Sequence, residues 1–358
     1  MPYWGIYLHH LGFDAKAIGE LIAIIMATKI IAPNIWGWLA AVTGYHVILV
    51  RISSLLTVIC FAGVLLRQDY LWLIIVMTTF SFFWNAALPQ FEAITFAYLG
   101  LQARRYTQIR LWGSIGFIIT VALLGWLLEH IPIRLLPTLL LSLFIGIGLS
   151  SLWVPEKVSS VAPTYAKSFY QVLRRPTILA FFAICFLMQV SHGPYYTFYS
   201  LYLENHGYTR DLIGQLWALG VVAEVLIFLV MHRLLIQFSL SQLLMMSLSL
   251  TALRWLLIGS AVNSLLILMF AQLLHAASFG IYHGVSMQLI RHYFADYHQS
   301  QAQALYSSLS FGAGGAVGSL ASGYIWQWGA PFSYYGATGV CFIAVWISWQ
   351  WLERDKLT

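Results

Sequence analysis

The sequence has few charged residues. Only 8% of its 358 residues are Asp, Glu, Lys or Arg, whereas 60% are apolar. Soluble domains carry about 25% charged residues, so this chain cannot cover a water-soluble surface. Its apolar segments run for about twenty residues without strict alternation, which excludes a disordered chain, a coiled coil and an outer-membrane barrel. The composition predicts an all-α integral membrane protein with many transmembrane helices.

Patterns of metal binding and nucleophilic catalysis are also lacking. Cys60, Cys185 and Cys341 each lie in an apolar run and have neither disulfide nor zinc-ligand spacing. A net charge of +6 is spread too thinly to indicate a nucleic-acid partner. We therefore expect no metal, no cofactor, no nucleic acid and no enzymatic activity. The first residues, MPYWGIYLHH, lack the basic region of a signal peptide.

Segments of membrane-spanning length are predicted at eleven places. They are 15–40, 47–66, 70–98, 106–128, 134–153, 176–203, 211–236, 240–260, 264–290, 302–326 and 331–351. Residues 1–9 look like the last turns of a twelfth helix whose beginning is missing. The longest polar stretch divides the chain, and the predicted parts are an N-terminal bundle at 1–154, a central loop at 155–175, a C-terminal bundle at 176–351 and a tail at 352–358.

An internal repeat supports two halves. Residues 6–21 align without gaps on residues 201–216, and the shared residues include Gly12/Gly207 and Gly19/Gly214. Parallel repeats of this kind build one large class of secondary transporters. The repeat therefore predicts two six-helix bundles, with the first helix truncated in this chain.

The basic residues of the loops predict the orientation. One set of connections holds Arg104, Arg105, Arg233, Arg291 and the four basic residues of the central loop, whereas the opposite set holds only Lys16, Arg67, Arg134 and Arg210. Lys and Arg accumulate on the cytoplasmic side of membrane proteins. The central loop and the C-terminus are therefore predicted to be cytoplasmic.

Ionisable residues within apolar spans are the strongest functional signal, because each costs about 2.5–3.5 kcal/mol at the bilayer centre and therefore usually faces a partner or a wet cavity. They are Lys29, Glu92, Arg110, Glu224 and Arg254, with His192, His275 and His283. Equal depth in their hairpins permits a Glu92–Arg110 pair and a Glu224–Arg254 pair. Purely structural ion pairs are the alternative to a polar central cavity.

The histidines titrate near neutral pH and suit a proton pathway with Glu224. His192 precedes Gly193-Pro194, where the helix should bend, and His275 and His283 should share one helix face because they are eight residues apart. Tyr195 and Tyr196 follow this bend and would suit a ring-bearing or sugar-like ligand. Each histidine alone is more often a hydrogen-bonded packing residue than a proton carrier, and it is the set with Glu224 that predicts a pathway.

Several segments resemble the major facilitator superfamily, and in particular its branch of 3-phenylpropionate transporter-like proteins, related to lactose permease and the nucleoside–proton symporters. They are PYWGIYLHHLGF, ATKIIAPNIWGWLA, YTQIRLWGSIGF, WALGVVAEVLIF and LRWLLIG. The resemblance implies twelve helices in two bundles, alternating access and proton-coupled uptake across the bacterial inner membrane. It also implies that Glu92 and Arg110 contact substrate and that Glu224, Arg254 and His275 form the coupling network.

Two departures from the family pattern matter. Ser278 stands where lactose permease has a carboxylate one turn after the histidine, and Ala41 and Val42 replace the charged pair of the loop motif in GWLAAVTGYH. We expect a monomeric proton symporter, embedded in lipid, for a small organic solute, with Arg110 or Lys29 pairing an anionic group. A sugar or nucleoside symporter is an alternative, and so is a transport-inactive sensor or degenerate paralogue.

Overall fold

The computed structural model describes residues 2–100, 106–156, 169–294 and 298–352, and every regular element in these ranges is helical. The elements are α1 (Trp4–His10), α2 (Ala15–Thr43), α3 (His46–Ala62), η1 (Gly63–Leu65), α4 (Tyr70–Leu99), α5 (Tyr106–His130), η3 (Ile133–Leu135), α6 (Leu136–Ser151), α7 (Phe169–Leu173), α8 (Pro176–Ser191), α9 (Gly193–Asn205), α10 (Arg210–Gln237), α11 (Leu240–Ser260), α12 (Leu265–Leu273), η4 (Ala276–Ile281), α13 (Tyr282–Tyr293), α14 (Gln299–Ser307), η6 (Ser308–Gly314), α15 (Gly315–Trp326) and α16 (Ala330–Trp351). Two of them, η4 and η6, are π-helical.

Apolar length explains most of these helices. In the described part of the chain, nine helical segments are long and apolar enough to cross a membrane. The long runs α2 and α14–η6–α15 fall outside this set, and they contact each other. All eleven predicted spans are helical, with small differences at their ends; the predicted span 240–260, for example, is α11. The all-α membrane fold predicted from composition is therefore confirmed.

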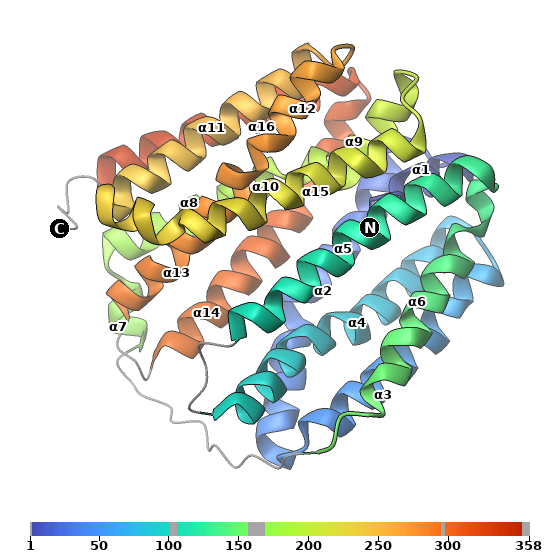
Figure 1. Ribbon diagram of the computed structural model, residues 1–358, viewed down its shortest axis with the longest axis horizontal. Helices are drawn as coiled ribbons and strands as arrows, with labels where there is room; N and C mark the ends of the chain where they lie inside the picture. Colours follow the sequence, from blue (N-terminus) through green and yellow to red (C-terminus); the bar gives the residue numbers. More distant parts are fainter. Residues whose placement is uncertain (1, 101–105, 157–168, 295–297, 353–358) are drawn as a thin grey trace.

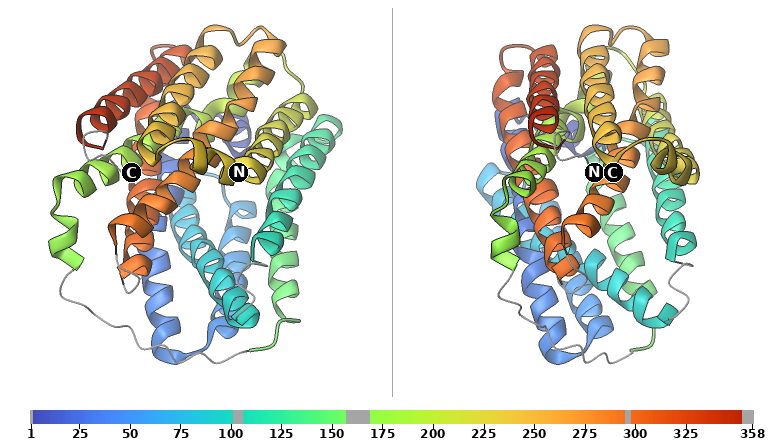
Figure 2. Two further views of the ribbon diagram at one scale, coloured as in Figure 1. Left: turned by 60° about the vertical axis from the view of Figure 1, so that its left-hand side comes forward. Right: turned by 90° about the vertical axis from the view of Figure 1, so that its left-hand side faces the viewer.

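The long helices run side by side between two ends of the molecule (Figure 2). One end carries the turn around Asp14, and the other carries the turn at Gly44. We call them the Asp14 end and the Gly44 end. The basic residues Arg104, Arg105, Lys157 and Lys167, which contribute to the predicted orientation, lie outside the described residues.

The helices form two groups that meet along two seams. Figure 1 shows α3, α4 and α6 on one side of the molecule and α11, α12 and α16 on the opposite side. Between them, α2 contacts α15 and α5 contacts α10, while α1 contacts α9. We call α1–α6 the N-terminal group and α8–α16 the C-terminal group. The bounds predicted for the central loop and the tail fall largely on 157–168 and 353–358, outside the described residues.

The internal repeat corresponds to a shared turn at the Asp14 end. Gly12 and Gly207 both have positive φ, 90° and 82°, which glycine adopts without steric cost. The next helices then begin with equivalent caps: the Asp14 side chain accepts from the Ala17 amide at 2.8 Å, and the Thr209 hydroxyl accepts from the Leu212 amide at 3.3 Å. The shared glycine and the similar capping residues therefore encode the same helix–turn–helix in both groups.

Glycines bring the two groups close together near the Asp14 end. A Cβ on Gly19 would lie 2.9 Å from the Cα of Gly323, across the α2–α15 seam. On the α5–α10 seam, a Cβ on Gly125 would lie 2.6 Å from the carbonyl oxygen of Arg210. Small residues let membrane helices approach this closely. The side chain that any other residue adds at these positions would force the groups apart.

The predicted bend at His192 is present. Helix α8 ends at Ser191 and α9 begins at Gly193, so the long span is interrupted at His192. The His192 Nδ1 lies 2.8 Å from the Met188 carbonyl oxygen and must donate to it. Together, α8 and α9 are the most buried of the nine apolar spans. The bend therefore lies inside the C-terminal group.

Candidate functional site

The candidate site is centred on Glu224, in the middle of α10. The Glu224 Oε2 lies 3.4 Å from the Nε2 of His275, and the two side chains are only 14% and 7% exposed. On the other side of the imidazole ring, Nδ1 lies 3.0 Å from the Nη1 of Arg254. The Glu224–Arg254 ion pair that equal depth permitted does not form, because His275 stands between the two side chains.

The contacts of His275 identify its tautomer. An arginine guanidinium donates hydrogen bonds and cannot accept them. Arg254 therefore donates to Nδ1 of His275, which must hold a lone pair, and the ring proton must lie on Nε2. In this arrangement the imidazole is neutral and its Nε2–H points at the Glu224 carboxylate. His275 cannot take up a second proton while the Arg254 bond is intact.

Arg254 is fully buried and its donors are satisfied by neutral groups. Its Nη1 also donates to the Ser278 hydroxyl at 2.8 Å, its Nη2 to the Gln272 amide oxygen at 3.1 Å and its Nε to the Ala271 carbonyl at 3.1 Å. None of these contacts is to a carboxylate, so no acidic group among them takes over from the carboxylate that lactose permease has at the position of Ser278. Glu224 is consequently the acidic group of this network, reached through His275.

Tyr195 makes a cation–π contact with Arg254. Its ring lies 4.2 Å from the guanidinium carbon of Arg254, and its hydroxyl donates to Gln272 at 3.1 Å. A cation held over an aromatic face gains electrostatic stabilisation when both are desolvated. Tyr195 is 1% exposed. The structure thus places this tyrosine within the C-terminal group as a packing partner of Arg254.

The helix around His275 departs from α-helical geometry. A π-helical segment, η4, starts at the next residue, and such segments are frequent at functional sites. Phe279 stacks between His275 and His283, with ring centroids 5.8 and 5.9 Å away. The two histidines therefore share one face, as predicted. His283 also interacts electrostatically with Glu224, and its Nδ1 lies 3.2 Å from the Tyr306 hydroxyl.

Glu92 and Arg110, both among the described residues of the N-terminal group, do not form the ion pair that their equal depth permits. Glu92 accepts a hydrogen bond from the Tyr106 hydroxyl at 3.0 Å. Over the described residues, no ion pair joins it to Arg110. Arg110 is exposed, and it interacts electrostatically with Glu224 and His283 of the other group. The predicted Glu92–Arg110 ion pair is thus not formed in the described residues, and Arg110 interacts electrostatically both with Tyr106 of its own group and with the other group.

Among the described residues, Lys29 and His192 form no hydrogen bond or ion pair with this network, although His192 interacts electrostatically with Arg254 and His275. Lys29 is half-buried in the middle of α2, and in the part of the chain that the structure describes it has neither an ion pair nor a hydrogen bond. His192 is fully buried; its ring stacks on Tyr196 at 5.5 Å and meets Trp255 edge-on at 4.9 Å. The local contacts of His192 are those of a packing residue. The Lys29 ammonium, by contrast, has no acidic partner among the described residues.

Two residues that contact the site are not predicted by the sequence patterns. Gln272, three residues before His275, is fully buried and joins Arg254 to Tyr195. Tyr106 holds Glu92. An amide within an apolar run was a usable signal for Gln272, because a buried amide needs partners. A tyrosine at the start of a span is common at membrane interfaces and carries no such signal.

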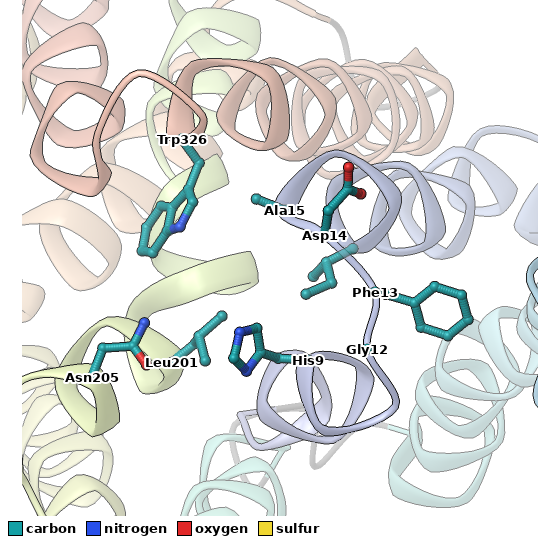
Figure 3. A pocket seen from close by; sticks show the side chains of 9 residues that line it. His9, Gly12, Phe13, Asp14, Ala15, Leu201, Asn205 and Trp326 are labelled. Atoms are coloured by element: carbon teal, nitrogen blue, oxygen red, sulfur yellow. The ribbon is translucent and has the colours of Figure 1, made fainter.

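A separate pocket of about 310 Å³ lies at the Asp14 end, between the two groups. It is lined by α1, the turn that follows it, α2, α9 and α15. His9, Asn205 and Trp326 point towards the pocket, whereas the Asp14 carboxylate and the Phe13 ring point away from it (Figure 3). This pocket shares no residue with the Glu224 network.

Known transporters match the chain over nearly its whole length. It is 28% identical to a probable 3-phenylpropionic acid transporter of Escherichia coli (strain K12), over 92% of this chain and 87% of that protein. It is 23% identical to a maltose permease of Geobacillus stearothermophilus, over 96% and 88%.

Solved structures share the fold at lower identity. The crystal structure of the nucleoside transporter NupG superimposes with a TM-score of 0.85, at 14% identity, over 100% of this chain and 95% of that one. A POT family transporter, solved in complex with a thioalcohol-conjugated peptide, gives a TM-score of 0.77 at 13% identity, over 99% and 91%. These likenesses confirm the major facilitator fold with its two bundles.

The family model described as MFS_1 like family matches residues 1–337. It covers α1 to the first turns of α16, including every residue of the Glu224 network. The predicted resemblance to the major facilitator superfamily is confirmed, and so is a transport function for small solutes in a membrane. The chain is a member of the MFS_1 like family.

Proposed function

We propose that the protein is a proton-coupled symporter for a small organic anion, such as an aromatic carboxylate. It acts by alternating access in the bacterial inner membrane, as a monomer with bundles at 1–154 and 176–351, and with the Gly44 end and the C-terminus in the cytoplasm. The observation that carries this proposal is the Glu224–His275–Arg254 chain. A largely buried carboxylate faces a neutral imidazole there, and a buried cation donates to the other ring nitrogen.

Glu224 is the proton carrier in this proposal. When it is ionised, it accepts from the Nε2–H of His275 and is attracted by Arg110 across the seam. When it takes a proton, its carbonyl oxygen still accepts from Nε2–H, and the attraction to Arg110 disappears. Protonation therefore changes the force between the two groups without requiring His275 to change tautomer. In this proposal His283, which interacts electrostatically with Glu224, exchanges a proton with this carboxyl. His192, which interacts electrostatically with His275 and Arg254, extends the pathway.

In this proposal the solute site lies between the two helix groups. It is formed by polar residues that are not hydrogen-bonded within the Glu224 network. Lys29 and Arg110 supply positive charge on the N-terminal side, which suits a carboxylate. Glu92 orders the site through Tyr106, and Tyr196 offers an aromatic face beside the α8–α9 break. The name of the Escherichia coli relative supports a ring-bearing acid as the solute.

The test uses Glu224→Gln in proteoliposomes, with labelled 3-phenylpropionate added outside and, for counterflow, unlabelled 3-phenylpropionate inside. We expect solute counterflow to persist, because the amide still accepts from His275, while accumulation driven by an imposed pH gradient is lost. Glu92→Gln is the matched control, since it neutralises another membrane carboxylate and should weaken counterflow and accumulation together. Uphill uptake by Glu224→Gln at the wild-type rate contradicts the proton assignment.

A neutral solute is the second candidate. Glu92 has only a tyrosine hydroxyl as a partner in the described residues, so it keeps acceptor capacity for sugar hydroxyls. A maltose permease and a nucleoside transporter are also among the similar proteins. Competition separates the two: inhibition of uptake by 3-phenylpropionate supports the anion, and inhibition by maltose or a nucleoside alone supports the neutral solute.

A further inference from the structure

The α5–α10 seam ends in hydrogen bonds that cross between the two helix groups. The Glu129 Oε2 on α5 accepts from the backbone amide of Arg210 at 2.8 Å. In the opposite direction, the Arg210 Nη1 on α10 donates to the Leu128 carbonyl oxygen at 2.9 Å. Both bonds lie at the Asp14 end, far from the Glu224 network.

Each bond satisfies a helix end that has no partner of its own. Arg210 is the first residue of α10, and its amide is one of the four that a helix leaves unbonded at its N-terminus. Leu128 lies in the last turn of α5, where the carbonyls are unbonded in the same way. A carboxylate is favoured at a helix N-terminus and a cation at a C-terminus, so both contacts have the favourable sign.

Other groups near these helix ends are bonded within their own helix group. Thr209 caps the Leu212 amide, and His130 Nδ1 lies 2.8 Å from the Trp126 carbonyl oxygen. Glu204, in the same group as Arg210, holds its Nε at 2.7 Å and so fixes the guanidinium in place. The Tyr3 hydroxyl also lies 3.4 Å from the Arg210 carbonyl oxygen, so the Glu129 and Arg210 side chains are the charged groups of this set that join the two groups.

We propose that Glu129 and Arg210 form a latch that keeps the Asp14 end closed. Each group caps a helix of the other, and both caps must break together when this end opens. On the α2–α15 seam the Tyr324 hydroxyl donates to the Glu20 carboxylate at 3.2 Å, and Lys16 lies over the Tyr324 ring. In the described residues this seam has no reciprocal capping of helix ends, because Ala15 occupies the repeat position of Arg210 and has no side chain that reaches across. The latch sets the balance between the state seen here and one that is open at the Asp14 end.

The test measures opening on the other seam. Ile18 on α2 is fully buried and lines the pocket at the Asp14 end. The labelling rate of Ile18→Cys by a water-soluble maleimide, followed on the purified full chain by peptide mass spectrometry, reports opening of the whole end. Local loosening of α5 and α10 leaves it unchanged. The readout needs neither solute nor gradient, so it is independent of the proposed function.

We expect Arg210→Leu to raise the labelling rate about three- to tenfold and Glu129→Ala about two- to fivefold, because both contacts are partly exposed and therefore of moderate strength. Arg67→Gln is the control, since it removes a cation at the same end whose partner Asp69 lies in the same group; it should leave the rate unchanged. The charge-swapped double variant, Glu129→Arg with Arg210→Glu, should not restore the wild-type rate, because it places both charges at the wrong helix ends.

Unchanged labelling in both single variants overturns the latch, and so does an equal increase in Arg67→Gln. If Arg210→Leu fails to fold, Glu129→Ala decides alone, because that residue is exposed and contributes little to packing. Restoration of the wild-type rate by the charge swap would replace reciprocal capping by a simple ion pair and overturn the mechanism stated here.

Discussion

The orientation and tautomer of His275 can be tested with two amides of different length. His275→Asn places an oxygen where Nδ1 stands and keeps an acceptor for Arg254, but it removes the donor to Glu224. His275→Gln reaches the position of Nε2 and keeps a donor to Glu224, but it removes the acceptor for Arg254. Each variant thus keeps one of the two hydrogen bonds of the His275 ring and loses the other.

The buried arginine decides which variant is more stable. Arg254 is fully buried, and a charged donor that loses its partner costs about 1.5–3 kcal/mol. Against this, Asn fills one methylene less of the space than Gln, which costs about 0.8 kcal/mol. We therefore expect His275→Asn to be more stable than His275→Gln by about 1–2 kcal/mol, although both are less stable than the wild type. Both variants lose the stack on Phe279, so that loss cancels in the comparison.

Equilibrium unfolding of the purified protein in mixed micelles measures this difference, and pH-driven accumulation in proteoliposomes gives the second readout. The order should reverse between the two: His275→Asn is the more stable variant, but His275→Gln is the better transporter, because it still contacts Glu224. A more stable His275→Gln refutes the assignment of Arg254 as the donor to Nδ1. It would mean that the ring is turned over.

Three further variants test other parts of the structure. Gly19→Val should raise maleimide labelling at the Asp14 end several-fold, because its Cβ would lie 2.9 Å from the Gly323 Cα and keep the α2–α15 seam from closing; Gly37→Val, with open space around its Cβ, is the control. Glu156→Ala should lower the free energy of unfolding by about 0.5–2 kcal/mol without changing transport, since its carboxylate accepts from three backbone amides at the start of α3. Lys29→Gln should raise the KM of an anionic solute about tenfold and leave that of a neutral one unchanged, which initial rates of uptake would show.

The sequence predicts the helices well because hydropathy and length determine them. The predicted span 70–98 is α4, and the break at His192 follows from the Gly-Pro that comes next. In a bilayer, backbone groups must be bonded within the helix, so a long apolar run has few alternatives. The shared turn of the repeat is likewise encoded locally, by Gly12 and Gly207 with the caps that follow them.

The contacts of the site are less predictable, because depth along a helix does not fix its rotation. The hairpin arithmetic predicts equal depth for Glu224 and Arg254, yet Arg254 faces α12 and η4 within its own group. The π-helical turn after His275 changes which residues face α10, and the residues Ala276–Ile281 give no local signal for it. The partners of Glu156 and Glu129 are distant in sequence, so hydropathy gives no indication of them.

The α5–α10 seam brings the two proposals together. Helix α10 carries Arg210 at its first residue and Glu224 in its middle, and α5 carries Glu129 near its end and Arg110 near its start. Two attractions therefore act across one seam: the latch, which does not depend on the transported proton, and the interaction of Arg110 with Glu224, which protonation abolishes. They lie about 21 Å apart along α10, at 1.5 Å per residue, and distant sites contribute independently to an equilibrium. The labelling rate of Ile18→Cys should consequently rise in Glu224→Gln as well, and in the double variant with Arg210→Leu the two increases should multiply. A double variant that labels no faster than Arg210→Leu alone would show that opening depends on the latch only, and that the proton acts elsewhere in the transport cycle.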